Sequence, residues 1–183
     1  KGDSNLARSI VNNDREIDEL ELKINEKCLT LLALYQPVAS DLRFVTTAIA
    51  IVTDLERIGD LASNIAQRVV EIGERPVFKS LTDLPQTVEI AEAMLHKSLD
   101  ALIKRDTKEA TDVTKMKVNA DKIINAFYME VKMFLSQNPN YINRGLSLIL
   151  ITHHLERIIG HVTNIAEDVV YMVDAEVIKH KVV

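Results

Sequence analysis

Apolar residues recur along this chain with the spacing of amphipathic helices. Between residues 4 and 35 an apolar side chain returns every seven positions, at Ile10, Ile17, Ile24 and Leu31, and charged residues fill the remaining faces. The four prolines stand between or at the ends of such stretches, as expected where helices begin and end. The pattern predicts five helices, over residues 4–35, 38–72, 82–104, 105–136 and 139–175.

The second half of the chain repeats the first. The tripeptides ERI at 56–58 and NIA at 64–66 recur at 156–158 and 164–166, a displacement of 100 residues. Residues 1–4 resemble residues 104–107, so the first half lacks an equivalent of the helix at 82–104. We therefore predict an all-α fold of two tandem three-helix bundles, the first without its N-terminal helix and with apolar faces that need a partner. One elongated bundle is the alternative.

The repeat sets the expected domains at residues 1–76 and 77–183. Composition agrees with a helical globular protein, since 47% of residues are hydrophobic and only 4% are aromatic, which argues against a β-sandwich or barrel. The net charge of −5 gives no attraction to nucleic acid. The single Cys28 cannot form an internal disulfide, and no apolar run is long enough to span a membrane. We expect a cytoplasmic protein without a nucleic-acid partner.

Oxygen-bearing side chains form a line on the second predicted helix. Glu56, Asp60 and Asn64 are spaced four residues apart and therefore share one stripe. Helical geometry places this stripe opposite the apolar face, toward solvent or a neighbouring protein. Carboxylate and amide oxygens bind hard or borderline cations such as Mg²⁺, Mn²⁺, Ca²⁺ or iron. The alternative is a solvated acidic face, because acids four residues apart are common on helices.

The second copy of this stripe is incomplete. Glu156 and Asn164 are retained, but Gly160 replaces the aspartate, and His153 lies one turn before Glu156 as a possible additional ligand. This departure predicts a weaker or rearranged second site.

Further acids lie on other predicted helices. Asp14 and Asp18 are one turn apart on the first helix, in a position to meet the helix of Glu56, and Asp121 is their nearest counterpart in the second half. Surface charge is the alternative for Asp14 and Asp18. Arg57 is expected to form a salt bridge with a neighbouring helix.

Sequence motifs of enzymes are missing. No Glu-x-x-His or His-Glu-x-x-His pair, no glycine-rich phosphate loop and no Gly-x-Ser-x-Gly occurs in the sequence, which leaves catalysis without candidate residues. We therefore predict that the chain is not an enzyme.

Four motifs together resemble the PhoU family of phosphate-uptake regulators: residues 36–43 (QPVASDLR), 54–60 (DLERIGD), 155–158 (LERI) and 163–167 (TNIAE). The likeness covers nearly all of the chain. It implies two similar three-helix bundles and a cytoplasmic adaptor, expected as a homodimer. Such an adaptor represses phosphate-starvation signalling by contacting the phosphate ABC transporter and a sensor histidine kinase.

The resemblance also implies metal ions, with iron, zinc, manganese or magnesium as the candidates. It carries the ligand role to Glu56 and Asp60, and to Glu156 without its aspartate partner. Two further hypotheses remain at this stage: a helical scaffold or dimerisation module whose acids only solubilise it, and a carboxylate-metal oxidase or phosphatase.

Overall fold

The computed structural model describes residues 4–12, 15–73 and 83–179 of the chain, and every regular element in these ranges is helical. This confirms the predicted all-α fold. The elements are α1 (Ser4–Asn12), α2 (Arg15–Tyr35), α3 (Ala39–Ile72), α4 (Asp83–Lys104), α5 (Thr107–Gln137), the short 3₁₀ helix η1 (Pro139–Tyr141) and α6 (Ile142–Asp174).

Local sequence signals set several helix ends. The Asp106 carboxylate accepts hydrogen bonds of 3.0 Å from the backbone N–H groups of Lys108 and Glu109 and thereby caps α5. Gly73 ends α3 with a φ of 69°, a conformation that glycine adopts without strain. Pro139 opens the 3₁₀ turn before α6. The predicted boundaries are confirmed here to within about three residues.

One predicted helix is divided in the structure. The sequence pattern predicts a single helix over residues 4–35, whereas α1 and α2 are separate helices. Between them lie residues 13–14, which are outside the described residues. The sequence there reads Asn12, Asn13 and Asp14, three consecutive residues of low helix propensity.

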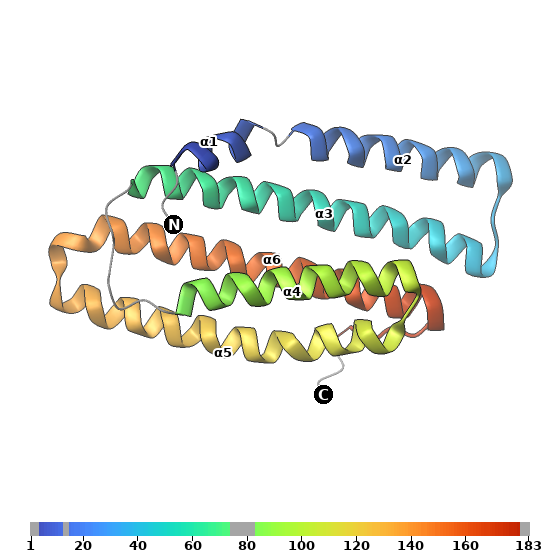
Figure 1. Ribbon diagram of the computed structural model, residues 1–183. Coiled ribbons are helices and arrows are strands. Elements are labelled where there is room, and N and C mark those ends of the chain that lie inside the picture. Colours follow the sequence, from blue (N-terminus) through green and yellow to red (C-terminus); the bar gives the residue numbers. More distant parts are fainter. Residues whose placement is uncertain (1–3, 13–14, 74–82, 180–183) are drawn as a thin grey trace.

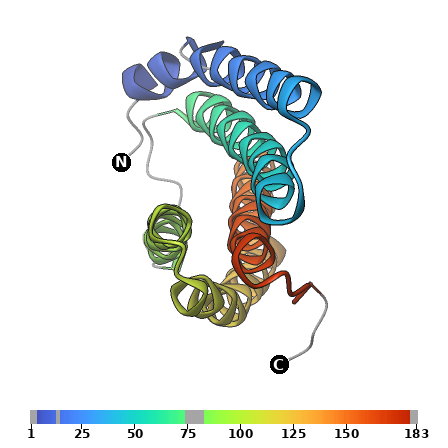
Figure 2. The ribbon, with the colours of Figure 1, turned by 90° about the vertical axis from the view of Figure 1, so that its right-hand side faces the viewer.

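The two halves meet through their last helices. Helices α4, α5 and α6 pack against one another, α1 and α2 pack on α3, and α3 packs along α6 (Figure 1). Figure 2, a view along the helices, shows them arranged in an open curve from α1 and α2 through α3 and α6 to α5 and α4. Buried residues of α3 to α6 belong to one core cluster, so the two repeats share their interior. The predicted domain boundary at residue 76 falls outside the described residues and stays a prediction.

An apolar groove remains open between the halves. Residues of α1, α3, α4 and α6 line a hollow of about 430 Å³, including Leu6, Ile10, Ile65, Val88 and Leu155. Leu6 and Ile10 are substantially exposed, so part of the apolar lining of this groove is open to solvent in the described structure. None of the described helices has a stretch long and apolar enough to cross a lipid bilayer.

Candidate functional site

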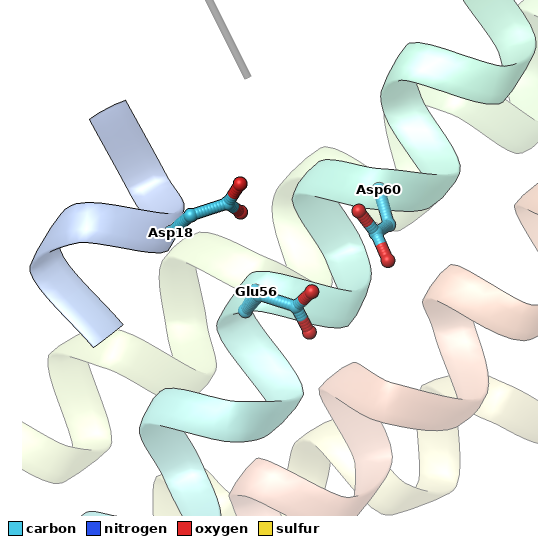
Figure 3. A group of neighbouring side chains, drawn as sticks. All are labelled: Asp18, Glu56 and Asp60. Carbon is cyan, nitrogen blue, oxygen red and sulfur yellow. The ribbon is translucent and has the colours of Figure 1, made fainter. Parts of the chain in front are cut away.

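Three carboxylates converge between α2 and α3. Asp18, Glu56 and Asp60 each offer an oxygen atom, and these atoms lie within 4.8 Å of one another (Figure 3). Among the described residues, no second group of three histidine, cysteine, aspartate or glutamate side chains is this close. The sequence analysis named all three of these residues as candidate metal ligands.

The backbone of α3 and the close approach of α2 position these acids. Glu56 and Asp60 are one turn apart and share a face of α3, and α2 crosses beside them with Asp18. Gly59 allows this approach: a Cβ atom at this position would lie 2.9 Å from Ile17 Cδ1 on α2. The sequence therefore places its glycine where the two helices touch.

A hydrogen bond also links α2 to α3 beside the acids. The Thr53 hydroxyl donates to Glu21 Oε1 over 3.1 Å. The contact holds Glu21, another acid of α2, near Glu56 without placing it among the three converging carboxylates.

Burial differs from the sequence-based expectation. The Glu56 side chain is only 14% exposed and that of Asp60 is 39% exposed, whereas Asn64, one turn further, is exposed. The prediction of a solvent-facing stripe is therefore wrong for Glu56, because α2 covers this part of α3. Asp14 lies outside the described residues.

The electrostatics at Glu56 favour a positive charge. Burial raises the pKa of Glu56, as does the neighbouring Asp60 carboxylate; Arg57 lowers it in part, and Glu21 raises it further. A raised carboxyl pKa means that the ionised form lacks full compensation by its surroundings. A cation bound between these oxygens would supply that compensation, so the donor set fits a hard or borderline metal ion.

Arg57 lies at the edge of the cluster. Its Nε is 3.4 Å from Glu56 Oε2, and its Nη1 is 3.2 Å from Asp60 Oδ2. The predicted salt bridge to a neighbouring helix is wrong, because both acids belong to the same helix as Arg57. The Arg57 side chain is 53% exposed, so water screens its attraction for these oxygens and a bound cation would compete with a half-solvated partner.

The second half arranges its acids differently. On α6, Glu156 Oε2 accepts a hydrogen bond of 3.2 Å from the Tyr128 hydroxyl of α5 and lies 3.7 Å from His153 Nδ1. Burial raises the pKa of Asp121 on α5, Lys117 lowers it, and Glu156 raises it again. Asp121 and Glu156 therefore interact across α5 and α6, as Asp18 and Glu56 do across α2 and α3.

Tyr128 was missed by the sequence analysis. Burial, followed by the nearby Glu156 carboxylate, raises the pKa of Tyr128 to about 12, so its hydroxyl remains a donor to Glu156 at neutral pH. The seven-residue spacing of Asp121 and Tyr128 places both on one face of α5 and is the signal that would have indicated it.

The remaining ligand candidate of the second half lies apart from Glu156 along α6. Asn164 lines an open hollow of about 550 Å³ together with Gly160, Arg157 and Lys117. A Cβ atom added at Gly160 would meet no neighbouring atom within 4 Å, so packing does not require glycine here. A ligand role for Glu156, Asn164 and Asp121 stays a prediction.

Comparison with known proteins connects both halves to one family. The PhoU domain family matches residues 1–69 and 84–169 of the chain. The Aquifex aeolicus "phosphate-specific transport system accessory protein PhoU homolog" is 34% identical over 176 residues, covering 96% of this chain and 80% of that protein. The protein of the same name from Pseudomonas aeruginosa is also 34% identical, with 97% and 74% covered.

Solved structures agree with this relationship. The crystal structure of PhoU from Pseudomonas aeruginosa superposes with a TM-score of 0.91 at 34% identity, covering 96% of this chain and 84% of that one. The PhoU structure from Streptococcus pneumoniae gives a TM-score of 0.89 at 30% identity, with 97% and 84% covered. The relatives are named as accessory proteins, in agreement with the prediction that the chain is not an enzyme. The chain belongs to the PhoU family.

Proposed function

We propose that this chain is a metal-binding regulatory adaptor of phosphate uptake. The relatives it resembles are named as accessory proteins of a phosphate-specific transport system, which supports a regulatory role in that process. The convergence of Asp18, Glu56 and Asp60 is the observation that supports metal binding.

The metal site joins two helices. Asp18 comes from α2, while Glu56 and Asp60 come from α3, so a bound cation would hold α2 against α3 and offset the repulsion between the acids. Carboxylate donors suit iron, zinc, manganese or magnesium. Asn64, one turn beyond Asp60, is a further candidate ligand of this site, Asp14 remains a candidate from the sequence alone, and Asp121, Glu156 and Asn164 are candidates for a second, weaker site.

The partners follow from the proposed role. In the cytoplasm, the chain contacts the phosphate ABC transporter and a sensor histidine kinase and represses phosphate-starvation signalling when phosphate is plentiful. Several large apolar side chains at one end of the described structure are well exposed, among them Leu34, Tyr35, Val38 and Ile103. Apolar side chains of this kind support binding to a partner protein or to a second copy in a homodimer.

Metal analysis tests the site. Protein purified without chelator is compared with the double variant Glu56→Ala/Asp60→Ala by elemental analysis, and we expect the variant to lose its metal. The matched control is Glu89→Ala/Glu92→Ala, which removes two exposed acids of α4 and should retain the metal. An unchanged metal content in the first variant refutes the site.

A reporter of phosphate starvation tests the adaptor role. In phosphate-replete cells that lack this protein, the reporter should be switched on, and the wild-type gene should switch it off again. Co-purification with the transporter and the kinase should accompany that repression. If the protein binds both partners but does not repress the reporter, it acts as a scaffold and not as a regulator. If its loss has no effect on the reporter, the regulatory role is refuted.

A further inference from the structure

Another pocket lies at one end of the molecule, where two helix connections meet the end of a third segment. It is formed around the turn between α2 and α3, the turn between α4 and α5, and the C-terminal end of α6, which lie together at the right of Figure 1. Its volume is about 350 Å³. Part of its wall is the segment 36–43, a motif that the proposed metal site and the apolar groove do not use.

Arg43 brings an unsatisfied donor to this pocket. Its Nε atom is buried and has no hydrogen-bond partner, although the guanidinium group is a strong donor on every nitrogen. A buried donor without an acceptor is unfavourable and is rare in folded proteins. Because Arg43 lines the pocket, a ligand acceptor there would satisfy this donor once the side chain turns toward it.

A second guanidinium lines the same pocket. Arg105, in the turn between α4 and α5, lies over the ring of Phe44 with its Cζ atom 5.7 Å from the ring centroid. This contact holds an otherwise exposed side chain at the pocket. Arg43 and Arg105 therefore approach from different elements, one from α3 and one from a turn far away in the sequence.

Neither guanidinium is neutralised by an acid in the described part of the chain. Two arginines there form ion pairs, Arg57 with Asp60 and Arg68 with Glu71 over 2.7 Å, whereas no ion pair involves Arg43 or Arg105. Asp41 also lines the pocket and is exposed, and it forms a salt bridge with neither. Two arginines without an ion pair that line one pocket form an arrangement typical of phosphate or carboxylate recognition.

The remaining lining is largely apolar and comes from Leu31, Phe44, Val45, Met172 and Val173. The pocket has the size of a small-molecule site and exceeds the space that a bare inorganic ion fills. We propose that it binds a small organic oxyanion, best a phosphate ester, with the charged head between Arg43 and Arg105 and the apolar body against Phe44 and Met172. This binding is separate from the metal site.

Titration of the full chain with phenyl phosphate, followed by calorimetry, tests this proposal, because the probe combines an oxyanion with an apolar ring. We expect saturable binding below about 10 mM and a loss of about 10-fold or more in affinity for Arg43→Gln and for Arg105→Gln. Arg43→Lys retains the charge without the planar fork and should also weaken binding. The control Arg68→Gln, at an arginine paired on its own helix, should bind as the wild type does.

Two comparison ligands and one spectroscopic measurement complete the test. Inorganic phosphate and phenol should each bind more weakly than phenyl phosphate, because each lacks one half of the recognised group. In NMR spectra the Arg43 Nε–H signal should shift on binding as it gains an acceptor.

The proposal is overturned if phenyl phosphate does not saturate, if both arginine variants bind it as the wild type does, or if inorganic phosphate binds equally well. Metal content in the folded arginine variants should stay at the wild-type value, so failure of this site and failure of the metal site are distinguishable.

Discussion

Asp54 on α3 and His161 on α6 form a hydrogen bond between the two repeats. Asp54 Oδ1 lies 2.7 Å from His161 Nδ1, and the two side chains are only 15% and 21% exposed. The residues are 107 positions apart in the sequence, and their helices form the contact through which the halves share a core. The pair is therefore a polar interaction in the otherwise mainly apolar contact between α3 and α6.

Removing this link should destabilise the protein. We expect Asp54→Ala and His161→Ala each to lower the free energy of unfolding by about 1–3 kcal/mol, because each leaves a largely buried partner unsatisfied. The double variant should lose less than the sum, as measured by urea denaturation in a double-mutant cycle. His96→Ala, at an exposed histidine, should change stability by less than about 0.5 kcal/mol. Strictly additive losses would contradict the link.

Stability should depend on pH through Glu56. The pKa of Glu56 in the folded protein is raised above the ordinary value of 4.5 by burial and by Asp60. At pH values between the ordinary pKa and the raised pKa, the folded state therefore binds more protons than the unfolded state. The free energy of unfolding must then fall as the pH rises through this window.

The variant Glu56→Gln removes this penalty. In buffer containing a chelator it should unfold at higher urea concentration than the wild type at pH 7, and this advantage should shrink toward zero below pH 4.5. Glu89→Gln, at an exposed acid of α4, is the control and should show no such trend. If the wild type were more stable than Glu56→Gln at neutral pH, the ionised Glu56 carboxylate would not be destabilised by its surroundings, and the prediction would be wrong.

Two glycines of α6 should respond in opposite ways to alanine. A Cβ atom at Gly145 would lie 2.5 Å from Leu135 Cδ1, whereas one at Gly160 meets nothing within 4 Å. We expect Gly145→Ala to cost about 1–3 kcal/mol through overpacking and Gly160→Ala to gain up to about 1 kcal/mol through helix propensity. Thermal unfolding of both variants checks this, and shifts of the same sign would contradict it.

Gly160→Asp should strengthen the second candidate metal site. The open space at Gly160 accommodates a carboxylate one turn after Glu156, which restores the spacing of Glu56 and Asp60. In a Glu56→Ala/Asp60→Ala background, we expect metal affinity to rise by about 10-fold or more. Metal titration measures it, with Gly160→Asn as the control that lacks the charge. Equal affinities for the two variants would exclude a site at Glu156.

Sequence reasoning succeeded where the signal is local. Asp106, Gly73 and Pro139 act through neighbouring backbone groups, so the helix ends they set were predicted from the chain alone. The four-residue spacing also identified Glu56 and Asp60 as a pair, because residues four apart on a helix share a face in any fold.

The remaining features depend on how helices cross. The apolar periodicity of α3 identifies the apolar and polar faces of that helix. It does not show that α2 packs over the polar face and buries Glu56. The partner of His161 is 107 residues away, and no spacing rule connects them. The long side chain of Arg57 can reach acids of its own helix or acids of a neighbouring helix. Sequence spacing alone therefore does not predict which acid it contacts.

The shared interior of the repeats has a consequence for dissection of the gene. Because α3 contributes to the same core cluster as α4, α5 and α6, a polypeptide cut after Gly73 would yield two fragments, each with part of a common interior exposed to water. Neither piece should be soluble and well ordered by itself. Mixed together, the two fragments should reassemble by complementation. The duplicated halves therefore depend on each other for folding and are not independent domains.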